Sequence, residues 1–260
     1  MVAESSRVPA LTNALAVLRV LASRATPVPV AALSRELAIP RSTTYHLLSV
    51  LEREGYVVHL PEARGYTLGL SVFELGTAYL RRNPLERIAR PLLLRLLDQV
   101  GHTTHLGVLH GAETLYLLKE SPRHPVVLVT DVGVRLPAQL TAVGRAILAQ
   151  LPRAQVRALF PGPAAFVDRT GRGPLSPGKL RTLLADESAR GWSEEDGHVT
   201  AGIASVAAAV RSADGRPVAA IGVTFPAGTF PPGPGRDGVA AQVVGAAAEM
   251  TRRLSGTRQP

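Results

Sequence analysis

Cysteine is absent from this chain of 260 residues, and lysine is nearly absent, with 2 residues against 27 arginines. Without cysteine the chain can form no disulfide framework, no thiolate metal site and no cysteine nucleophile. This composition fits a reducing cytoplasm. The excess of arginine over lysine can arise from the base composition of a genome, so it indicates a nucleic-acid partner only weakly.

The sequence also lacks a membrane-spanning pattern. The longest uncharged stretch in the C-terminal half, residues 217–235, holds five prolines and four glycines, which a spanning helix could not accommodate. The N-terminus has no basic segment followed by an apolar one, as a secretory signal would have. We therefore expect a soluble, cytoplasmic protein without a membrane partner.

The remaining composition is that of a basic globular protein. The net charge is +9, the isoelectric point is about 10.9, and 46% of the residues are hydrophobic. A chain of this length forms one or two domains, and its charge makes nucleic acid a candidate partner. The net charge is +3 over residues 1–82 and +6 over residues 83–260. Any DNA binding must therefore depend on a few well-placed arginines and on dimerisation.

The first third of the chain has the pattern of short helices followed by a hairpin. Apolar residues recur at helical spacing in three segments, and β-prone residues fill two more. The expected helices are 11–24 with Thr12 as its cap, 30–37 and 41–54, and the expected strands are 56–60 and 66–68 around a turn at 61–65. In the third helix we expect Tyr45, Leu47, Leu48 and Leu51 to face inward.

Beyond residue 70 the pattern becomes mixed α and β. A helix over 71–82 precedes one over 85–100. Pro84, directly before the second helix, suits the first position of a helix, and Pro91 within it predicts an offset or kink. We place the domain boundary near Asn83. The expected later helices are 142–150, 177–190 and 236–254, and the expected strands are 105–110, 114–119, 126–131, 205–211 and 218–224. Asp214 and Gly215 predict a tight turn, and the Pro/Gly-rich segment 227–238 a loop.

The segment Val30–Tyr56 predicts a helix-turn-helix, followed by the hairpin as a wing. In such a unit the N-terminal residues of the second helix reach base edges and phosphates in the major groove. The candidate DNA-contacting residues are Arg35, Arg41, Ser42, Thr43, Thr44, His46 and Arg64, the last at the tip of the hairpin. Each has a simpler explanation alone, since Ser and Thr often cap helices and arginines are often solvated. Their order along the chain favours a DNA-reading head.

Specific motifs in both halves resemble one family, the IclR-type transcriptional regulators. The motifs of the first half are Leu33-Ser34-Arg35-Glu36-Leu37, Pro40-Arg41-Ser42-Thr43, Leu51-Glu52-Arg53-Glu54-Gly55-Tyr56 and Gly65-Tyr66-Thr67-Leu68-Gly69. Those of the second half are Gly133-Val134-Arg135-Leu136-Pro137, Thr141-Ala142-Val143-Gly144-Arg145-Ala146, Arg190-Gly191-Trp192 and Gly202-Ile203-Ala204-Ser205-Val206-Ala207. The resemblance covers roughly residues 10–255.

The resemblance implies an α/β protein of two domains. It would comprise a flexible tail (1–9), a winged helix-turn-helix (10–70), a linker helix (71–83) and a GAF-like α/β effector-binding domain (84–256). The protein would bind a palindromic operator in double-stranded DNA as a homodimer or a dimer of dimers. The apolar residues Val72, Leu75 and Tyr79, on one side of the linker helix, would contribute to the dimer.

The resemblance also implies a pocket for a small organic effector, a carboxylate or an aromatic compound. By matching motif positions, its wall would include Leu136, Thr141, Ala142, Val143, Glu195, Ser205, Gly222 and Thr224. Hydroxyls, an apolar wall and the start of the helix at residue 142 suit a small polar ligand. Two departures stand out: Glu195 lies in an acidic run typical of a solvated loop, and Gly222 offers no side chain.

Three other functions deserve comparison. His102, His105 and His110 suggest a metal site, but strand geometry separates their side chains and no acidic ligand lies between them, so we expect no metal or cofactor. The sequence has no G-x-S-x-G, H-E-x-x-H or glycine-rich phosphate loop, so we expect no enzyme. A stand-alone small-molecule carrier that kept a vestigial head stays open; DNA binding would distinguish it from a regulator.

Overall fold

The structure is a computed structural model that describes residues 8–82 and 85–256. Most of the expected tail, residues 1–7, lies outside the described residues, and so do Asn83 and Pro84 with the expected boundary and helix start. The chain divides at Asn83 and Pro84 into two compact units, which we treat separately.

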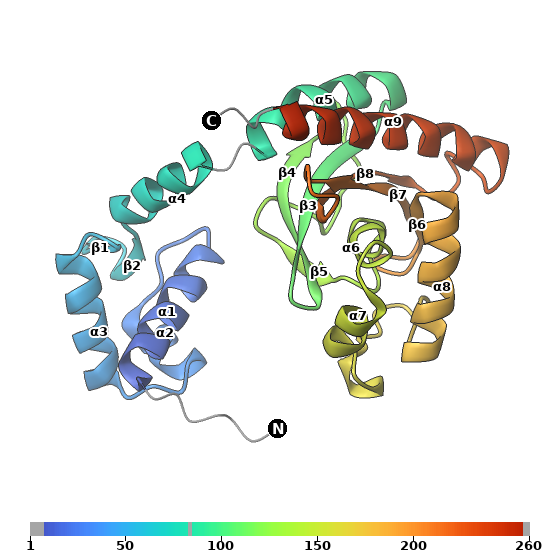
Figure 1. Cartoon of the computed structure of the whole chain (residues 1–260). Coiled ribbons are helices and arrows are strands. Elements are labelled where there is room, and N and C mark those ends of the chain that lie inside the picture. Colours follow the sequence, from blue (N-terminus) through green and yellow to red (C-terminus); the bar gives the residue numbers. More distant parts are fainter. Residues whose placement is uncertain (1–7, 83–84, 257–260) are drawn as a thin grey trace. The chain divides into compact units, whose positions relative to one another are not determined.

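The N-terminal unit is a helix-turn-helix with a small wing (Figure 1). Its elements are α1 (Pro9–Ala22), α2 (Val30–Glu36), α3 (Arg41–Arg53), β1 (Val57–Leu60), β2 (Gly65–Leu68) and α4 (Leu70–Arg82). Prolines mark the starts of two helices. Pro29 and Pro40 are the residues directly before α2 and α3, and both have an extended conformation. Val17, Leu33, Leu48 and other apolar residues of α1–α3 and the wing form its core.

Two details of this unit differ from expectation. Thr12 does not cap α1, because the helix already starts at Pro9 and the Thr12 hydroxyl donates to the Val8 carbonyl from within the first turns. Tyr45 does not face inward, since it is 56% exposed while Leu48 and Leu51 are buried. The inward face of α3 is therefore centred on Thr44, Leu48 and Leu51.

The wing is held against the rest of its unit by backbone contacts. β1 and β2 pair from Val57 with Leu68 to Leu60 with Gly65. Val28 and Tyr66 exchange two backbone hydrogen bonds of 2.9 Å, which add the segment before α2 to the edge of β2. Gly69 closes the base of the wing, because a Cβ at this position would lie 2.2 Å from the Gly55 carbonyl oxygen.

The C-terminal unit is an α/β structure built on one antiparallel sheet of order β5-β4-β3-β8-β7-β6. The strands are β3 (Thr103–His110), β4 (Glu113–Glu120), β5 (Arg135–Pro137), β6 (Ser193–Asp196), β7 (Ile203–Arg211) and β8 (Pro217–Pro226). The helices are α5 (Leu85–Val100), α6 (Ala142–Leu148), α7 (Arg153–Leu159), α8 (Pro177–Arg190) and α9 (Pro234–Gly256), with a 3-10 turn η1 (Pro163–Ala165). Figure 1 shows α5 and α9 side by side along one face of the sheet, while α6 packs on the other.

Two apolar clusters follow from these layers. The larger cluster lies between the sheet and α5 and α9, and includes Leu93, Val206, Ile221 and Val243. The smaller lies between the sheet and α6, and includes Tyr116, Leu136 and Val143. The register of β3 against β4 shifts between Leu106 and Gly107, where Leu117 of β4 is an extra, bulged residue, so that Tyr116 and Leu118 contribute to different clusters.

Several elements of this unit were not expected. Residues 126–131 are not a strand, although they are rich in β-branched residues, and β5, β6 and α7 were not foreseen. α6 ends at Leu148 rather than Gln150, and the expected loop 227–238 ends early because α9 begins at Pro234. The Asp214-Gly215 turn is present between β7 and β8, with Gly215 at φ +81°.

Candidate functional site

The exposed face of α3 gathers most of the residues expected to contact DNA. Arg41, Ser42 and His46 are exposed and Thr43 is half-buried. Helical spacing places Tyr45 and Ser49 on the same exposed face, so the sequence interpretation missed Tyr45 by assigning it to the core. Its distance of four residues from Arg41 was the signal that could have placed it correctly.

Thr44 is not part of this surface. Its side chain is fully buried, and its hydroxyl donates to the Pro40 carbonyl over 3.1 Å. The expectation that Thr44 contacts DNA therefore conflicts with its position in the core of the unit. Thr44 instead holds the first turn of α3 against the preceding proline.

Two further arginines lie near the helix-turn-helix elements. Arg35 is exposed in the last turn of α2. Arg64 is exposed in the turn of the wing and adopts a left-handed conformation with φ +50°, which is uncommon for a residue other than glycine. Neither arginine forms an ion pair within the described part of the chain.

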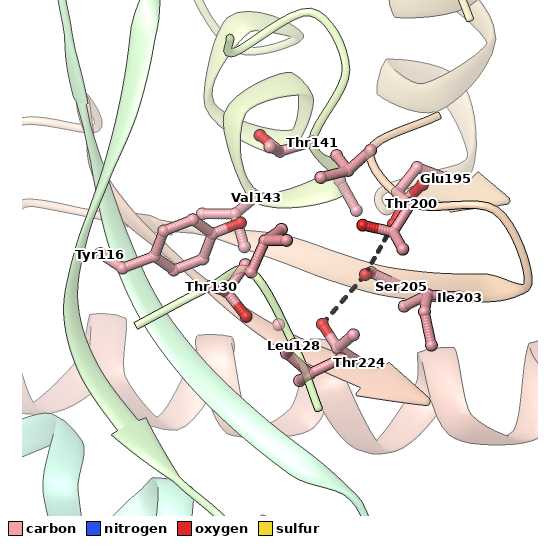
Figure 2. A pocket seen from close by; sticks show the side chains of 14 residues that line it. Tyr116, Leu128, Thr130, Thr141, Val143, Glu195, Thr200, Ile203, Ser205 and Thr224 are labelled. Carbon is pink, nitrogen blue, oxygen red and sulfur yellow. Dashed lines mark hydrogen bonds between the residues drawn. The ribbon is translucent and has the colours of Figure 1, made fainter. Parts of the chain in front are cut away.

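A pocket lies on the α6 side of the sheet in the C-terminal unit (Figure 2). Seven of the eight residues expected to form an effector site line it. They are Thr141, Ala142, Val143, Glu195, Ser205, Gly222 and Thr224. Leu136, the eighth, does not line it but packs in the apolar cluster between the sheet and α6. The cavity of about 20 Å³ has room for about one water molecule, so this conformation is closed.

Gly222 serves the pocket by having no side chain. A Cβ there would lie 2.8 Å from Val143 Cγ2 and would push α6 away from the sheet. The lack of a hydroxyl at this position, noted from the sequence, thus lets α6 pack closely against β8. Thr141 caps α6, since its hydroxyl accepts from the Gly144 N–H over 2.9 Å and lies 2.8 Å from Thr114 Oγ1.

A chain of polar groups runs along one wall of the pocket. Ser205 Oγ donates to Glu195 Oε1 over 2.9 Å and lies 3.0 Å from Thr224 Oγ1. The His198 N–H donates to Glu195 Oε2 over 3.0 Å. Glu195 is 3% exposed, and its burial raises the pKa of the carboxyl to about 7, against the lowering effect of the Ser205 and backbone hydrogen bonds. The acidic run 194–196 belongs to strand β6 and is not a solvated loop, and Glu195 faces the pocket.

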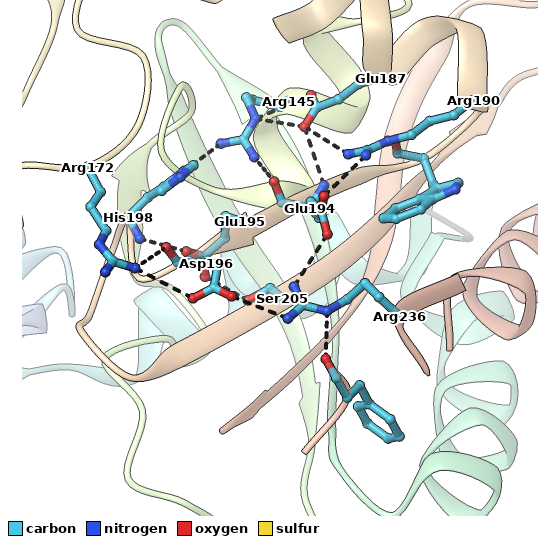
Figure 3. Close-up of polar contacts among 12 residues, drawn as sticks. Arg145, Arg172, Glu187, Arg190, Glu194, Glu195, Asp196, His198, Ser205 and Arg236 are labelled. Carbon is cyan, nitrogen blue, oxygen red and sulfur yellow. Dashed lines mark hydrogen bonds and ion pairs between the residues drawn. The ribbon is translucent and has the colours of Figure 1, made fainter. Parts of the chain in front are cut away.

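A buried arginine holds this wall in place (Figure 3). Arg145 of α6 forms a salt bridge of 3.0 Å with Glu187 of α8, and both side chains are fully buried. It also donates to the carbonyls of Gln139 and Glu194. Arg145 thereby ties the turn before α6 to β6, and so fixes the positions of Thr141 and Glu195 in the pocket.

A second arginine connects the same strand to α9. Arg236 is almost fully buried and pairs with Glu194 Oε2 at 3.4 Å and Asp196 Oδ2 at 3.3 Å (Figure 3). It also donates to the Phe230 carbonyl over 3.0 Å. The outward carboxylates of β6 are thus paired with arginines, among them Arg236 from a distant part of the chain, while Glu195 faces the pocket.

The sequence interpretation missed four polar groups at or beside the pocket. Tyr116, Thr130 and Thr200 line it, and Thr130 Oγ1 is buried without a hydrogen-bond partner among the described residues. His105 packs its ring against Tyr116, with ring centroids 5.3 Å apart, and burial lowers its pKa to about 3. Tyr116 could have been found from its alternation with Thr114 along β4. Thr130 had no local signal, since its segment has no regular structure.

Two negative findings apply to residues 8–82 and 85–256. No group of three or more His, Cys, Asp or Glu side chains there could hold a metal ion. No helix in those ranges is both long enough and apolar enough to cross a membrane.

A winged helix-turn-helix joined to an α/β unit with a closed polar pocket defines a two-domain transcriptional regulator. Comparison with known proteins agrees. Residues 10–61 match the IclR helix-turn-helix domain, and residues 77–252 match the family described as bacterial transcriptional regulator IclR C-terminal. The chain therefore belongs to the IclR family, whose members are DNA-binding transcriptional regulators and not enzymes.

Individual relatives match along most of their length. The chain is 32% identical over 220 residues to the uncharacterised HTH-type transcriptional regulator RhmR of Escherichia coli K12, covering 85% of this chain and 84% of the relative. It is 28% identical over 258 residues to the transcriptional repressor IclR of the same strain, covering 98% and 93%. An IclR homologue from Microbacterium hydrocarbonoxydans, crystallised with 4-hydroxybenzoate, shares the fold with a TM-score of 0.82 at 22% identity, over 95% of this chain and all of that one.

Proposed function

We propose that this protein reads a partly palindromic operator in cytoplasmic DNA through α3 and the wing. Arg41, Ser42, Thr43 and His46 would contact base edges and phosphates, and Arg35 and Arg64 the flanking backbone. The exposed face of α3 carries this proposal, because its cationic and hydroxyl side chains are solvent-accessible at the end of the helix that enters the groove in such folds. The reading head would comprise residues 10–70.

The active form would be a homodimer, or a dimer of dimers. A single head of this size contacts too little DNA for tight specific binding. Support comes from apolar side chains left exposed on α1 and on α4, the core of the proposed linker 71–83: Leu11, Leu15, Leu70, Phe73, Leu75 and Tyr79. Apolar groups in such numbers on short helices are typical of surfaces that associate.

The C-terminal unit, taken as residues 84–256, would bind a small organic effector in the pocket beneath α6. The segment 127–132, which forms part of the pocket wall, must move away first, because the closed cavity holds about one water molecule. This segment includes Leu128 and Thr130 in the wall, but Val127 beside them is 94% exposed and Val132 is 58% exposed. Opening would therefore remove few apolar contacts. Aromatic carboxylates are the first candidates, since a homologue was crystallised with 4-hydroxybenzoate.

The test is a gel-shift experiment on the DNA upstream of the protein's own reading frame, with and without 4-hydroxybenzoate. We expect sequence-specific retardation that random DNA does not compete away, and a change in apparent affinity with an effector. Absence of specific binding to this and to other genomic fragments would favour the stand-alone carrier instead.

A further inference from the structure

We infer that the pocket binds an organic anion together with one proton, which is taken up between Glu195 and Ser205. This inference rests on the proposed effector role of the pocket and specifies the ligand chemistry that the pocket accepts. It follows from the direction of the hydrogen bonds along the pocket wall and from the charges around it (Figure 2).

The hydrogen-bond directions are fixed when Glu195 is ionised. Each hydroxyl has one hydrogen to donate. Ser205 donates its hydrogen to Glu195 Oε1, so Thr224 must donate its own hydrogen to Ser205 across the 3.0 Å contact. Thr224 then offers only lone pairs to the pocket. In this state none of these three side chains has a hydrogen free to donate to a carboxylate.

The charge of the pocket points the same way. None of the described residues that line it is Lys, Arg or His, and Glu195 is the only carboxylate among them. An anion entering beside an ionised Glu195 would meet a like charge inside a region of low dielectric. With Glu195 ionised, this wall of the pocket therefore opposes the class of ligand that the proposed function assigns to it, although Thr130 Oγ1 on another wall has no partner among the described residues and is free to donate.

One proton removes both obstacles. Oε2 accepts from the His198 backbone N–H at 3.0 Å, whereas Oε1 faces Ser205, so a proton on Oε1 is the one that can be donated along the row. Glu195 Oε1 then donates to Ser205, Ser205 turns its hydrogen to Thr224, and Thr224 is free to donate to the ligand. The whole row reverses without moving a heavy atom. The proton comes from solvent, and the negative charge of Glu195 disappears as that of the ligand arrives.

The surroundings of Glu195 allow it to take up this proton near neutral pH at a small cost in free energy. Burial raises the pKa of Glu195 to about 7, although the Arg145 charge acts to lower it. Of the other titratable groups nearby, His198 and His105 have pKa values lowered by burial to about 4 and about 3, so both are neutral. Burial also raises the pKa of Tyr116, which keeps its phenol neutral.

The remaining charges near β6 are paired with one another. Arg145 and Arg190 lie against Glu187 of α8, Arg190 and Arg236 against Glu194, and Arg172 and Arg236 against Asp196 (Figure 3). These ion pairs give the outer carboxylates cationic partners, whereas Glu195 forms no ion pair among the described residues. Glu195 is thus the group in this wall whose protonation can change when a ligand binds.

The experiment is calorimetric titration with 4-hydroxybenzoate and with its neutral analogue 4-hydroxybenzyl alcohol, between pH 6 and pH 8.5. Each titration is repeated in buffers of different ionisation enthalpy, which gives the number of protons taken up. We expect the anion to take up about one proton above pH 7 and its Kd to weaken by about tenfold per pH unit there. The alcohol can accept or donate, so its Kd should be independent of pH.

The variant Glu195→Gln tests the assignment to this residue. The amide mimics the protonated acid, since its N–H donates to Ser205 while its oxygen accepts from the His198 N–H. We expect its Kd for the anion to be constant over the pH range, with no proton uptake. Asp98→Asn, an equal change of charge on the exposed side of α5, should keep the wild-type pH dependence.

The outcomes separate the two proposals. Binding of 4-hydroxybenzoate to the wild type without proton uptake would overturn this inference and leave the proposed function standing. Uptake that persists in Glu195→Gln would overturn the assignment to this carboxyl. If neither the anion nor the alcohol binds at any pH, the proposed aromatic effector role fails, and the inference fails with it. The wild-type measurement decides even if the variant does not fold.

Discussion

At the scale of single residues, Glu195 links the pocket to the stability of its unit. Its pKa is about 7 in the folded protein against an ordinary value of 4.5, so the folded state holds more protons between these pH values. Stability contributed by the protonated form is therefore present at low pH and is lost as the pH rises from about 4.5 to about 7. The shift corresponds to about 3 kcal/mol.

Glu195→Gln should abolish this dependence. We expect the free energy of unfolding of the C-terminal unit to fall between pH 5 and pH 8 by up to about 3 kcal/mol more in the wild type than in the variant. Urea unfolding at four pH values, with Asp98→Asn as the control for loss of one charge, measures the difference. Parallel pH curves for wild type and Glu195→Gln would contradict the raised pKa.

The buried pair of Arg145 and Glu187 gives a second test. Arg145→Met leaves the fully buried Glu187 carboxylate with only Arg190, 3.7 Å away, as a cationic partner, which should cost up to about 3–5 kcal/mol of unfolding free energy. The double variant Arg145→Met, Glu187→Leu removes both charges and should recover part of that loss. Recovery is incomplete, because the Gln139 and Glu194 carbonyls still lose their donor. Urea unfolding that shows the two substitutions to be additive would count against the pairing.

Arg41 tests the proposed DNA surface. If its guanidinium grips a guanine, Arg41→Ala should weaken operator binding by about 1–3 kcal/mol and affect random DNA much less. Arg53→Ala, at the other end of α3 and already paired with Glu54, is the matched control. Gel shifts on both DNAs distinguish the roles: an equal loss on operator and random DNA would make Arg41 a phosphate contact.

At the scale of elements, the helices and the wing were predictable because periodicity and proline act locally. Pro29, Pro40 and Pro177 stand at the starts of their helices, and the Pro61–Gly65 turn joins the wing strands as expected. β6 was not predictable. Its sequence Ser-Glu-Glu-Asp is typical of a solvated loop, and it becomes a strand because Arg145, Arg190 and Arg236 from elsewhere in the chain neutralise or bind it.

The candidate sites show the same limit. Family motifs located seven of the eight expected pocket residues, since motif positions carry tertiary information that composition lacks. Thr130 was out of reach, because residues 126–131 have the β-branched composition of a strand but find no neighbouring strand to pair with. Thr44 was assigned to the surface and Tyr45 to the core, the reverse of their positions in the structure. The run of short polar residues at the start of α3 has no clear apolar periodicity from which to assign them.

The exposed side of α4 predicts the dimer. Leu75 and Tyr79 are 58% and 55% exposed on one side of the helix, and Glu74 lies about 100° around the helix from Leu75. Burial of a leucine contributes about 1.5–3 kcal/mol, so Leu75→Glu in both copies should weaken dimerisation at least tenfold. Light scattering at micromolar concentration measures this, with Glu74→Ala as the control. A wild-type monomer under these conditions would remove the dimer hypothesis.

At the scale of the whole molecule, regulation requires the pocket and the head to be coupled energetically. An effector that binds equally well to the DNA-competent and DNA-incompetent states shifts nothing, however tightly it binds. The chain from α4 to α5 is the covalent connection between the two units. A coupling free energy of about 1–3 kcal/mol is usual for such switches, which corresponds to a change in operator affinity of about 5- to 150-fold.

This coupling must be reciprocal, and that gives its sharpest test. Operator DNA must change the Kd of the effector by the same factor by which the effector changes the Kd of the operator. We expect Ser205→Ala combined with Thr224→Val to abolish both factors, because the double variant removes the hydroxyl row that would meet the ligand. Both residues lie in the C-terminal unit, so operator affinity without effector should stay within about twofold of the wild type.

Two measurements, operator titration with and without effector and effector titration with and without operator, close the cycle. A double variant that still responds normally would place the effector elsewhere. A double variant whose operator binding collapses even without effector would make the hydroxyl row structural. The two hydroxyls, far along the chain from α3, would then be needed for the protein to bind DNA at all. Only loss of both factors together, with the head still binding DNA, is what a regulatory pocket requires.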